Sequence, residues 1–165
     1  MLEGQRLLRY NYLGRQYCFF ERERFSSTER AFFLDSSMRI PVDHSVVSSE
    51  FGKRISPISG KWHFHSGIDL AAKEGENVYA CRSATVLKCV ENDSVYGNFI
   101  VLSHGGGMTS LYAHLSAILV EKGQTVFKGQ HIGNVGQTGL ATGPHLHFEI
   151  RQNDVPSNPN SVLSK

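Results

Sequence analysis

Short runs of apolar and β-branched residues recur along the chain and predict a series of strands. The clearest runs are residues 84–90, 98–105, 109–115 and 146–151, and each has the length and composition of a strand. Glycine-rich turns separate the runs, among them two K-G-Q triplets at 122–124 and 128–130. No segment has the periodicity of an amphipathic helix, although residues 115–119 could form one helical turn. The pattern predicts a mostly-β domain of many short strands.

The first 45 residues differ in composition from the rest and are expected to form an N-terminal β extension. Two strand-like segments occur there, each with a turn signal: 10–23 with Leu13–Gly14, and 30–42 with Asp35–Ser37. A boundary falls near Pro41–Ser49, after which glycine and histidine become frequent. We therefore divide the chain into residues 1–45, packed on the main body, and residues 46–165, which hold all the candidate chemistry.

Composition excludes several functional classes. The 165 residues carry a formal net charge of +2, which is too small to indicate nucleic-acid binding, although it suits a partner that carries carboxylates. No run approaches the roughly 18 apolar residues of a membrane helix. The N-terminal segment MLEGQRLLRY also lacks the apolar block of a signal peptide. The protein is therefore either cytosolic or numbered from after a removed leader.

The cysteines give little information about function. Cys18, Cys81 and Cys89 show no C-x-x-C spacing of the metal-binding type and are interpreted as buried apolar thiols. A bridge between Cys81 and Cys89 requires that their strands pair. The eight histidines are more informative, because several of them occur in short patterned strings.

The string HLHFEI at 145–150 is the most specific of these. Side chains alternate along a strand, so His145, His147 and Glu149 point to one face while the apolar residues between them point to the core. Two imidazoles then lie roughly 6–7 Å apart along the strand, facing one space. Both can reach a single metal ion or substrate.

A second string pairs His65 with Asp69 in HFHSGIDLAA. An extended chain would hold the two residues too far apart for one ion, so a bend at Ser66–Gly67 is required, which glycine permits. Imidazole and carboxylate are suitable zinc ligands, but this pattern taken alone is more often a structural hydrogen-bonded pair.

A third string, LYAHL, ends an alternating segment with His114. On a regular strand His114 shares a face with Tyr112 and Ser110, while Leu111 and Ala113 face the core. Taken alone, His114 is interpreted as a half-buried structural histidine.

Together the three strings supply the ligands and the proton-transfer groups of one metal site. His65, Asp69 and one histidine of the H-x-H pair supply three ligands, which leaves a fourth zinc position open. The other histidine of that pair and His114 are then available for proton transfer. The remaining histidines are interpreted as structural or solvated, although His63 could line the site: His44, His63, His104 and His131.

The combination resembles the lysostaphin-type (LytM-like) zinc endopeptidases, which cut peptide bonds in bacterial peptidoglycan. The matching segments are SSEFGKRISPISG, HSGIDLAAKEGENVYA, YGNFIVLSHGGGMTSLYAHLS and the run from VEKGQ to VPSNP, covering roughly residues 46–160. The resemblance implies a duplicated-hybrid-motif β sandwich with an open substrate groove, preceded by the β extension. It also implies one Zn²⁺ per chain.

Carried over by position, the resemblance implies distinct roles for the histidines. His65, Asp69 and His147 become the zinc ligands. His145 becomes the general base for the attacking water, and His114 the second catalytic histidine, which holds that water and stabilises the oxyanion. Strand geometry alone leaves open which of His145 and His147 binds the metal.

The N-terminal segment resembles the β segment that precedes the catalytic domain in larger Gram-negative endopeptidases. This implies that the chain is a fragment or short form of an exported protein, periplasmic or extracellular, and that it cleaves D-alanyl–diaminopimelate crosslinks. We expect it to act as a monomer on peptidoglycan stem peptides.

Three alternatives remain. One is an endopeptidase for polyglycine bridges, and another is a cell-wall module with an inactive site, which the complete set of ligands disfavours. The third is a sugar phosphotransferase carrier domain, which the K-G-Q turns and HSGID also resemble. That reading makes His65 or another histidine a phosphoacceptor and leaves the H-x-H and Asp69 unexplained.

Overall fold

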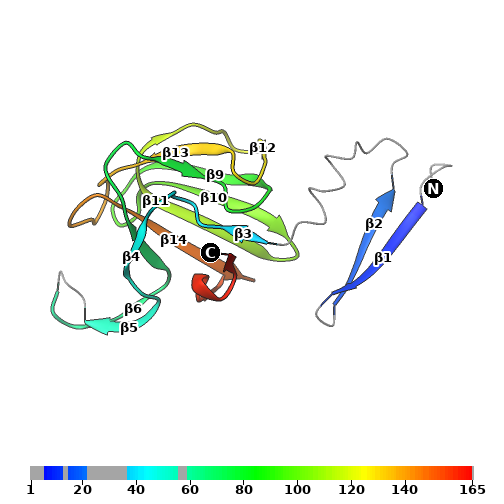
Figure 1. Ribbon diagram of the computed structural model, residues 1–165, viewed down its shortest axis with the longest axis horizontal. Helices are drawn as coiled ribbons and strands as arrows, with labels where there is room; N and C mark the ends of the chain where they lie inside the picture. The colour runs from blue at the N-terminus through cyan, green and yellow to red at the C-terminus, as the bar shows by residue number, and fades with distance from the viewer. Residues whose placement is uncertain (1–5, 13–14, 22–36, 56–58, 165) are drawn as a thin grey trace. The chain divides into compact units, whose positions relative to one another are not determined.

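The computed structural model describes residues 6–12, 15–21, 37–55 and 59–164 (Figure 1). The chain divides into two compact units, Met1–Ser36 and Ser37–Lys165. In the first unit, β1 (Arg6–Tyr12) and β2 (Arg15–Glu21) pair antiparallel, with Tyr10 opposite Tyr17.

β2 lies within the segment expected at residues 10–23, whereas β1 begins before that segment, at Arg6. The turn expected at Leu13–Gly14 lies outside the described residues, as does most of the segment expected at 30–42. The division of the chain at residues 45 and 46 stays a prediction.

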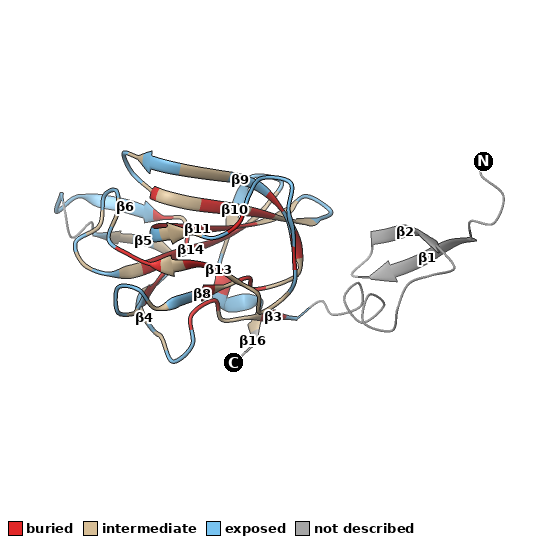
Figure 2. Ribbon diagram, turned by 90° about the horizontal axis from the view of Figure 1, so that it is seen from above, coloured by how far each residue is buried: buried red, intermediate tan, exposed pale blue. Residues whose placement is uncertain are grey.

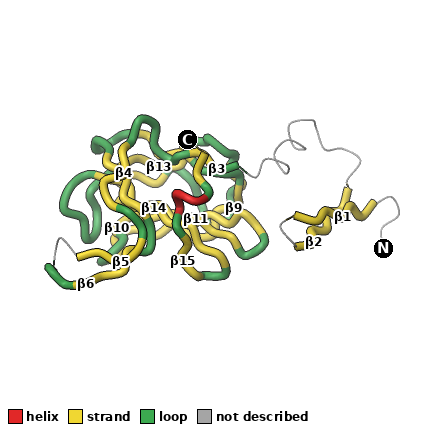
Figure 3. The backbone as a smooth tube through the Cα atoms, turned by 60° about the horizontal axis from the view of Figure 1, so that its bottom comes forward, coloured by secondary structure: helices red, strands yellow, loops and turns green. Residues whose placement is uncertain are grey.

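The second unit consists of strands joined by turns, as Figure 3 shows. Its elements are β3 (Met38–Arg39), β4 (Val46–Ser49), β5 (Gly52–Ile55), β6 (Trp62–His65), β7 (Ile68–Ala71), β8 (Asn77–Tyr79), β9 (Ala84–Asp93), β10 (Gly97–Gly105), β11 (Met108–Ile118), β12 (Thr125–Val126), β13 (His131–Val135), β14 (His145–Gln152), β15 (Val155–Ser157), the 3-10 turn η1 (Pro159–Ser161) and β16 (Leu163–Ser164). Within the described part of the chain, no helix is long and apolar enough to cross a membrane. The mostly-β prediction is confirmed.

One ten-stranded sheet organises this unit. Its main path runs β12, β9, β10, β11, β14, β7, β4, while β13 pairs with β11 and β8, and β15 pairs with β14. Strands β5 and β6 form a separate antiparallel hairpin, and β3 pairs with β16 in parallel. Continuous runs of buried residues lie on β11 and β14 (Figure 2).

The core contains the apolar residues predicted from the alternation in β14. Leu146, Phe148 and Ile150 are at most 1% exposed. They pack in one cluster with apolar residues of the neighbouring strands, among them Ile68, Leu70, Ile100, Leu102, Val86 and Ile132.

The face predicted for the residues of β11 is wrong. Tyr112 lies in the core, with its ring centroid 5.2 Å from that of Phe148. Leu111 and Ala113 are instead in register with Glu149 and His147. The phenol of Tyr112 can be buried because its hydroxyl has polar partners: the Cys81 N–H at 3.0 Å and Ser110 Oγ at 3.1 Å. The helical turn considered at 115–119 is strand through Ile118.

The two K-G-Q triplets build the same turn twice. Gly123 and Gly129 have positive φ values of 87° and 78°, which glycine adopts without a steric penalty. The glutamine that follows each glycine accepts a hydrogen bond through Oε1 from a backbone N–H three residues earlier, at 3.0 Å in both turns. The repeat therefore specifies the turns on either side of β12 rather than a ligand site.

The cysteines do not form the bridge considered from the sequence. Cys81 and Cys89 are both free thiols. Cys81 is fully buried in the core cluster, and Cys89 is half-buried, with its Sγ 3.3 Å from the Val120 carbonyl oxygen. Both are consistent with the packing role expected for them.

Truncating a core leucine tests this packing. Leu102 is fully buried in β10, whereas Leu87 on the neighbouring β9 is 41% exposed. We expect Leu102→Ala to lower the free energy of unfolding by about 2–5 kcal/mol, because a buried side chain is lost and a cavity is left. Leu87→Ala serves as the matched control and should change it by less than about 1 kcal/mol. Urea unfolding measures both, and equal midpoints for the two variants would contradict the assigned core.

Candidate metal centre

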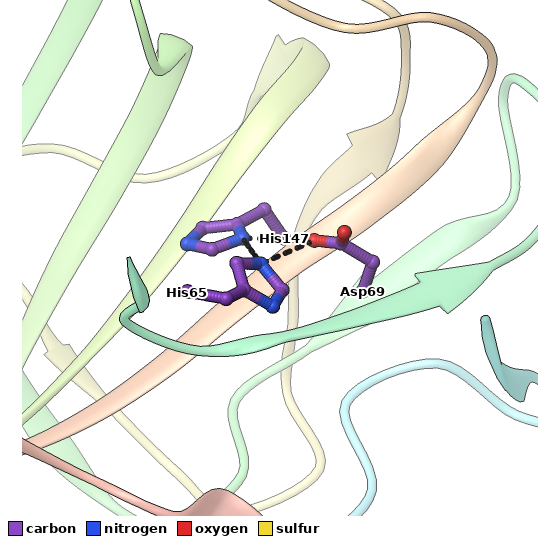
Figure 4. A group of neighbouring side chains, drawn as sticks. All are labelled: His65, Asp69 and His147. Carbon is purple, nitrogen blue, oxygen red and sulfur yellow. Dashed lines mark hydrogen bonds and ion pairs between the residues drawn. The ribbon is translucent and has the colours of Figure 1, made fainter. Parts of the chain in front are cut away.

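Three side chains from different strands converge on one buried point. His65 ends β6, Asp69 lies in β7 and His147 in β14 (Figure 4). Asp69 Oδ1 lies 3.1 Å from His65 Nε2 and 2.9 Å from His147 Nδ1, and the two nitrogens are 3.1 Å apart. All three residues are at most 9% exposed.

The sheet register and one bend create this convergence. In the antiparallel pairing of β7 with β14, Asp69 stands directly opposite His147. The chain bends at Ser66–Gly67, as the sequence predicted, and brings His65 to the same point. A Cβ on Gly67 would lie 2.3 Å from the Phe148 carbonyl oxygen, so only glycine fits this close approach.

Hydrogen bonds on the outer side of each ring determine which imidazole nitrogens face the cluster. His65 Nδ1 lies 2.8 Å from the Glu50 carbonyl oxygen, and His147 Nε2 lies 3.0 Å from Glu149 Oε1. Both oxygens are acceptors only, so each of these outer nitrogens carries a proton. His65 Nε2 and His147 Nδ1 therefore face the Asp69 carboxylate, as donors where they carry a proton and as ligands where a cation replaces it.

This donor set fits a divalent cation. Burial would raise the pKa of Asp69, but hydrogen bonds with His147 and His65 hold it well below its usual range. Burial likewise lowers the pKa of His147, but Asp69 and Glu149 outweigh burial and raise it. Two imidazole nitrogens and a carboxylate oxygen at these distances can surround a shared proton or a metal ion. Ligands of a tetrahedral zinc are about 3.3 Å apart, close to the spacing seen here, and zinc binding would displace the proton.

His145 lies beside this cluster. Its Nδ1 is 2.8 Å from the Gly143 carbonyl oxygen, so Nδ1 carries the proton and Nε2 the lone pair. His145 Nε2 lies 3.7 Å from Asp69 Oδ1, and the side chain is 16% exposed. A histidine of the H-x-H pair is thus held next to the cluster without belonging to the three-donor group.

His114 reaches the same place through an irregularity in β11. Its φ is 62°, and the pairing with β10 shifts register between residues 98 and 100, which pair with Leu115 and Tyr112. This break in alternation moves His114 off the core face of Tyr112 and toward the cluster. Its ring centroid lies 4.8 Å from that of His145 and 5.9 Å from that of His147.

The environment of His114 keeps it neutral. Burial lowers its pKa to about 4, although a hydrogen bond to the Thr138 carbonyl oxygen opposes this shift. That bond, at 2.8 Å, places the proton on Nδ1. His114 therefore presents an Nε2 lone pair, as His145 does.

Several residues around the cluster were missed or left unassigned by sequence reasoning. Glu149 is fully buried; burial raises its pKa, but hydrogen bonds with His147, Arg151 and Ser66 lower it to about 2. Arg54 Nη2 lies 3.4 Å from Asp69 Oδ2. The i, i+2 spacing from His147 places Glu149 on the same face of the strand but gives it no role. Arg54 carries no local sequence signal.

The other histidines lie in separate surroundings. His104 is hydrogen-bonded with Ser110 Oγ at 2.8 Å and the Ser83 carbonyl at 3.1 Å, and burial lowers its pKa to about 4. His131 packs against Tyr79, with ring centroids 5.9 Å apart. His44 and His63 are exposed.

The β5 and β6 hairpin carries an exposed aromatic surface. Trp62 and Phe64 are 76% and 51% exposed, and Ile55, in register with Trp62, is 59% exposed. β6 ends at His65, so the hairpin is joined to the cluster directly along the chain. Figure 1 shows the hairpin projecting from the main sheet.

Comparisons with known proteins agree with this geometry. The model of peptidase family M23 matches residues 63–159. DD-carboxypeptidase/endopeptidase Mpg of Neisseria meningitidis is 44% identical over 122 residues, covering 74% of this chain and 28% of the relative. The chain thus spans little more than a quarter of the length of that relative.

Solved structures show the same fold. A crystal structure of a zinc-containing peptidase from Vibrio cholerae superposes with a TM-score of 0.69 and 36% identity, over 74% of this chain and 39% of the other. The catalytic domain of lysostaphin from Staphylococcus simulans gives a TM-score of 0.65 and 30% identity, over 72% and 92%. The lysostaphin-like fold expected from the sequence is confirmed, and the chain belongs to peptidase family M23.

Proposed function

We propose that this chain is a zinc-dependent peptidoglycan hydrolase that cleaves peptide crosslinks, as a D,D-endopeptidase of the D-alanyl–diaminopimelate type. The observation that carries the proposal is the convergence of His65, Asp69 and His147 beside two further histidines. The name of the Neisseria relative supports the choice of bond. The chain would act on stem peptides in the periplasm or outside the cell, as a monomer.

Metal binding and proton transfer are assigned to different residues. His65 Nε2, an oxygen of Asp69 and His147 Nδ1 would hold the zinc ion. When bound, zinc would polarise the scissile carbonyl and lower the pKa of a water from about 15.7 towards 7. The Nδ1–H of His145 is held by the Gly143 carbonyl, so its Nε2 can take a proton from the attacking water and return it to the leaving amine.

His114 has a narrower role than the sequence resemblance implies. A neutral ring whose Nδ1–H binds the Thr138 carbonyl offers only a lone pair at Nε2. It can therefore accept a hydrogen bond from the attacking water and help to orient it. It can stabilise an oxyanion only after Nε2 has gained a proton.

Two substitutions separate metal binding from proton transfer. We expect Asp69→Ala to lose zinc, because one of three donors is removed. His145→Ala should keep zinc and lose about 10²–10⁴-fold in turnover, the range for a general base. Zinc content by atomic absorption and turnover on purified sacculi measure the two effects.

His44→Asn is the matched control, because His44 is exposed and asparagine tolerates its φ of 55°. It should retain both zinc and turnover. Zinc-free His145→Ala together with fully loaded Asp69→Ala would show that the roles are assigned wrongly.

The products identify the bond. After digestion of sacculi from a Gram-negative bacterium, mass spectrometry should show crosslinked dimers converted into monomers that end in D-alanine, with the diaminopimelate amine released. Removal of zinc with a chelator should abolish the conversion. Cleavage confined to polyglycine bridges would favour the lysostaphin-type alternative, and release of nothing by the zinc-loaded protein would favour a non-hydrolytic module.

The aromatic surface of the hairpin should contribute to substrate binding. Lys53 and Lys61 flank Trp62 and Phe64 there, which suits a polymer that carries carboxylates. We expect Trp62→Ala to weaken binding to sacculi about tenfold, the equivalent of 1.4 kcal/mol, with zinc content unchanged. Phe127→Ala removes an aromatic side chain that is 53% exposed on another part of the chain and is the control. Binding is measured by pull-down with sacculi after zinc has been removed, so that the substrate is not cleaved. Equal binding by Trp62→Ala and Phe127→Ala would show that the hairpin does not contribute to substrate binding.

A further inference from the structure

Glu149 is a fully buried carboxylate that joins three segments of the chain: β14 itself, the bend at Ser66 and the turn at Tyr96. Its Oε1 accepts hydrogen bonds from Ser66 Oγ at 2.6 Å, Tyr96 OH at 3.0 Å and His147 Nε2 at 3.0 Å. Its Oε2 accepts from Arg151 Nε at 2.6 Å. A buried carboxylate is costly unless its oxygens are satisfied, and here both are.

The contact with Glu149 defines the role of each nitrogen of the His147 ring. An ionised carboxylate is only an acceptor, so the contact at 3.0 Å requires a proton on Nε2. The other nitrogen, Nδ1, lies 2.9 Å from Asp69 Oδ1, which is also an acceptor, so Nδ1 is the atom that a cation would bind in place of a proton. Among the described contacts of His147, Glu149 is the acceptor that keeps the proton on Nε2.

The contact with Ser66 acts on the second histidine. Ser66 follows His65 directly, within the bend that brings His65 to the cluster. The bend lies close enough to β14 that a Cβ on Gly67 would come within 2.9 Å of Glu149 Cγ. One carboxylate therefore holds the bend after His65 and the ring of His147 at once.

Tyr96 and Arg151 complete the network. Arg151 Nη2 also donates to Tyr96 OH at 3.3 Å, so the two groups support each other as well as Glu149. The guanidinium balances the carboxylate charge, with Arg151 28% exposed and Glu149 0% exposed. The site can therefore contain an ionised Glu149 without leaving an uncompensated buried charge.

We infer that Glu149 is a positioning residue, which holds His147 in the Nε2–H tautomer and links it through Ser66 to the His65 bend, so that both imidazoles present lone pairs to one cation. This inference rests on the proposed zinc site and concerns the affinity for metal rather than hydrolysis. Partners that orient a ligand in this way typically change metal affinity by about 10–100-fold.

The test compares Glu149→Gln with Glu91→Gln. Both substitutions remove one carboxylate from a strand at nearly constant volume, but Glu91 is exposed on β9. Zinc affinity is measured by competition with a chromophoric chelator, and the urea unfolding of each metal-free protein is recorded alongside. We expect Glu149→Gln to bind zinc about 10–100-fold more weakly, with Glu91→Gln unchanged.

A spectroscopic readout separates positioning from a merely structural role. Imidazole ¹⁵N shifts of the zinc-loaded proteins at pH 8 report whether His147 binds zinc through Nδ1 and keeps its proton on Nε2. We expect this form alone in the unsubstituted protein and a mixture with the form bound through Nε2 in Glu149→Gln. Lower unfolding stability with an unchanged tautomer and unchanged zinc affinity would overturn the inference.

Ser66→Ala provides a second variant if Glu149→Gln does not fold. It removes one donor to Glu149 and leaves the charges untouched, and it should weaken zinc binding about 3–10-fold with the metal-free fold retained. Unchanged affinity would overturn the link to the His65 bend. If the unsubstituted protein binds zinc but releases nothing from sacculi, the proposed hydrolysis fails, and the affinities of the variants still decide the role of Glu149.

Discussion

The register between β7 and β14 is the constraint on which the candidate site depends. It places Asp69 opposite His147, so a carboxylate and an imidazole from distant parts of the sequence face each other on one side of the sheet. A slip of one residue would turn every side chain of β14 to the other face and would bury His145 and His147 in the core. Leu146 and Phe148 are fully buried in this register, and a slip would expose them. Their burial therefore fixes the register, and the register positions the site.

The site also requires that each histidine ring be held in one orientation by a hydrogen bond from its outer nitrogen. His65, His145 and His114 each place Nδ1 2.8 Å from a backbone carbonyl oxygen. A carbonyl oxygen can only accept a hydrogen bond, so Nδ1 is the donor in all three rings. His147 is different, because its outer nitrogen, Nε2, donates to the side chain of Glu149 rather than to the backbone. Groups fixed in this way need little reorganisation during a reaction, which is the condition for effective electrostatic catalysis.

Local sequence patterns predicted the parts of the site that regular strands create. The alternation in β14 assigned His147 and Glu149 to one face, and the glycine after Ser66 indicated the required bend. The same rule failed in β11, because the hydroxyl of Tyr112 has partners in the core and because the strand is irregular at His114. Both causes involve other strands, so the residues of β11 alone could not reveal them. The separate roles of the two H-x-H histidines came from the family resemblance rather than from geometry.

His114 shows why the irregularity in β11 belongs to the site. A positive φ is unfavourable for a residue with a Cβ, by about 1–2 kcal/mol, and persists only where surrounding contacts require it. Here the His114 N–H donates to the Tyr96 carbonyl at 2.9 Å, and its ring donates to the Thr138 carbonyl. Thr138 is itself anchored, because its Oγ1 donates to the Leu115 carbonyl and accepts from the Asn98 N–H. A regular strand would place His114 beside Tyr112 in the core, so the strained backbone is what brings the fifth polar side chain to the cluster.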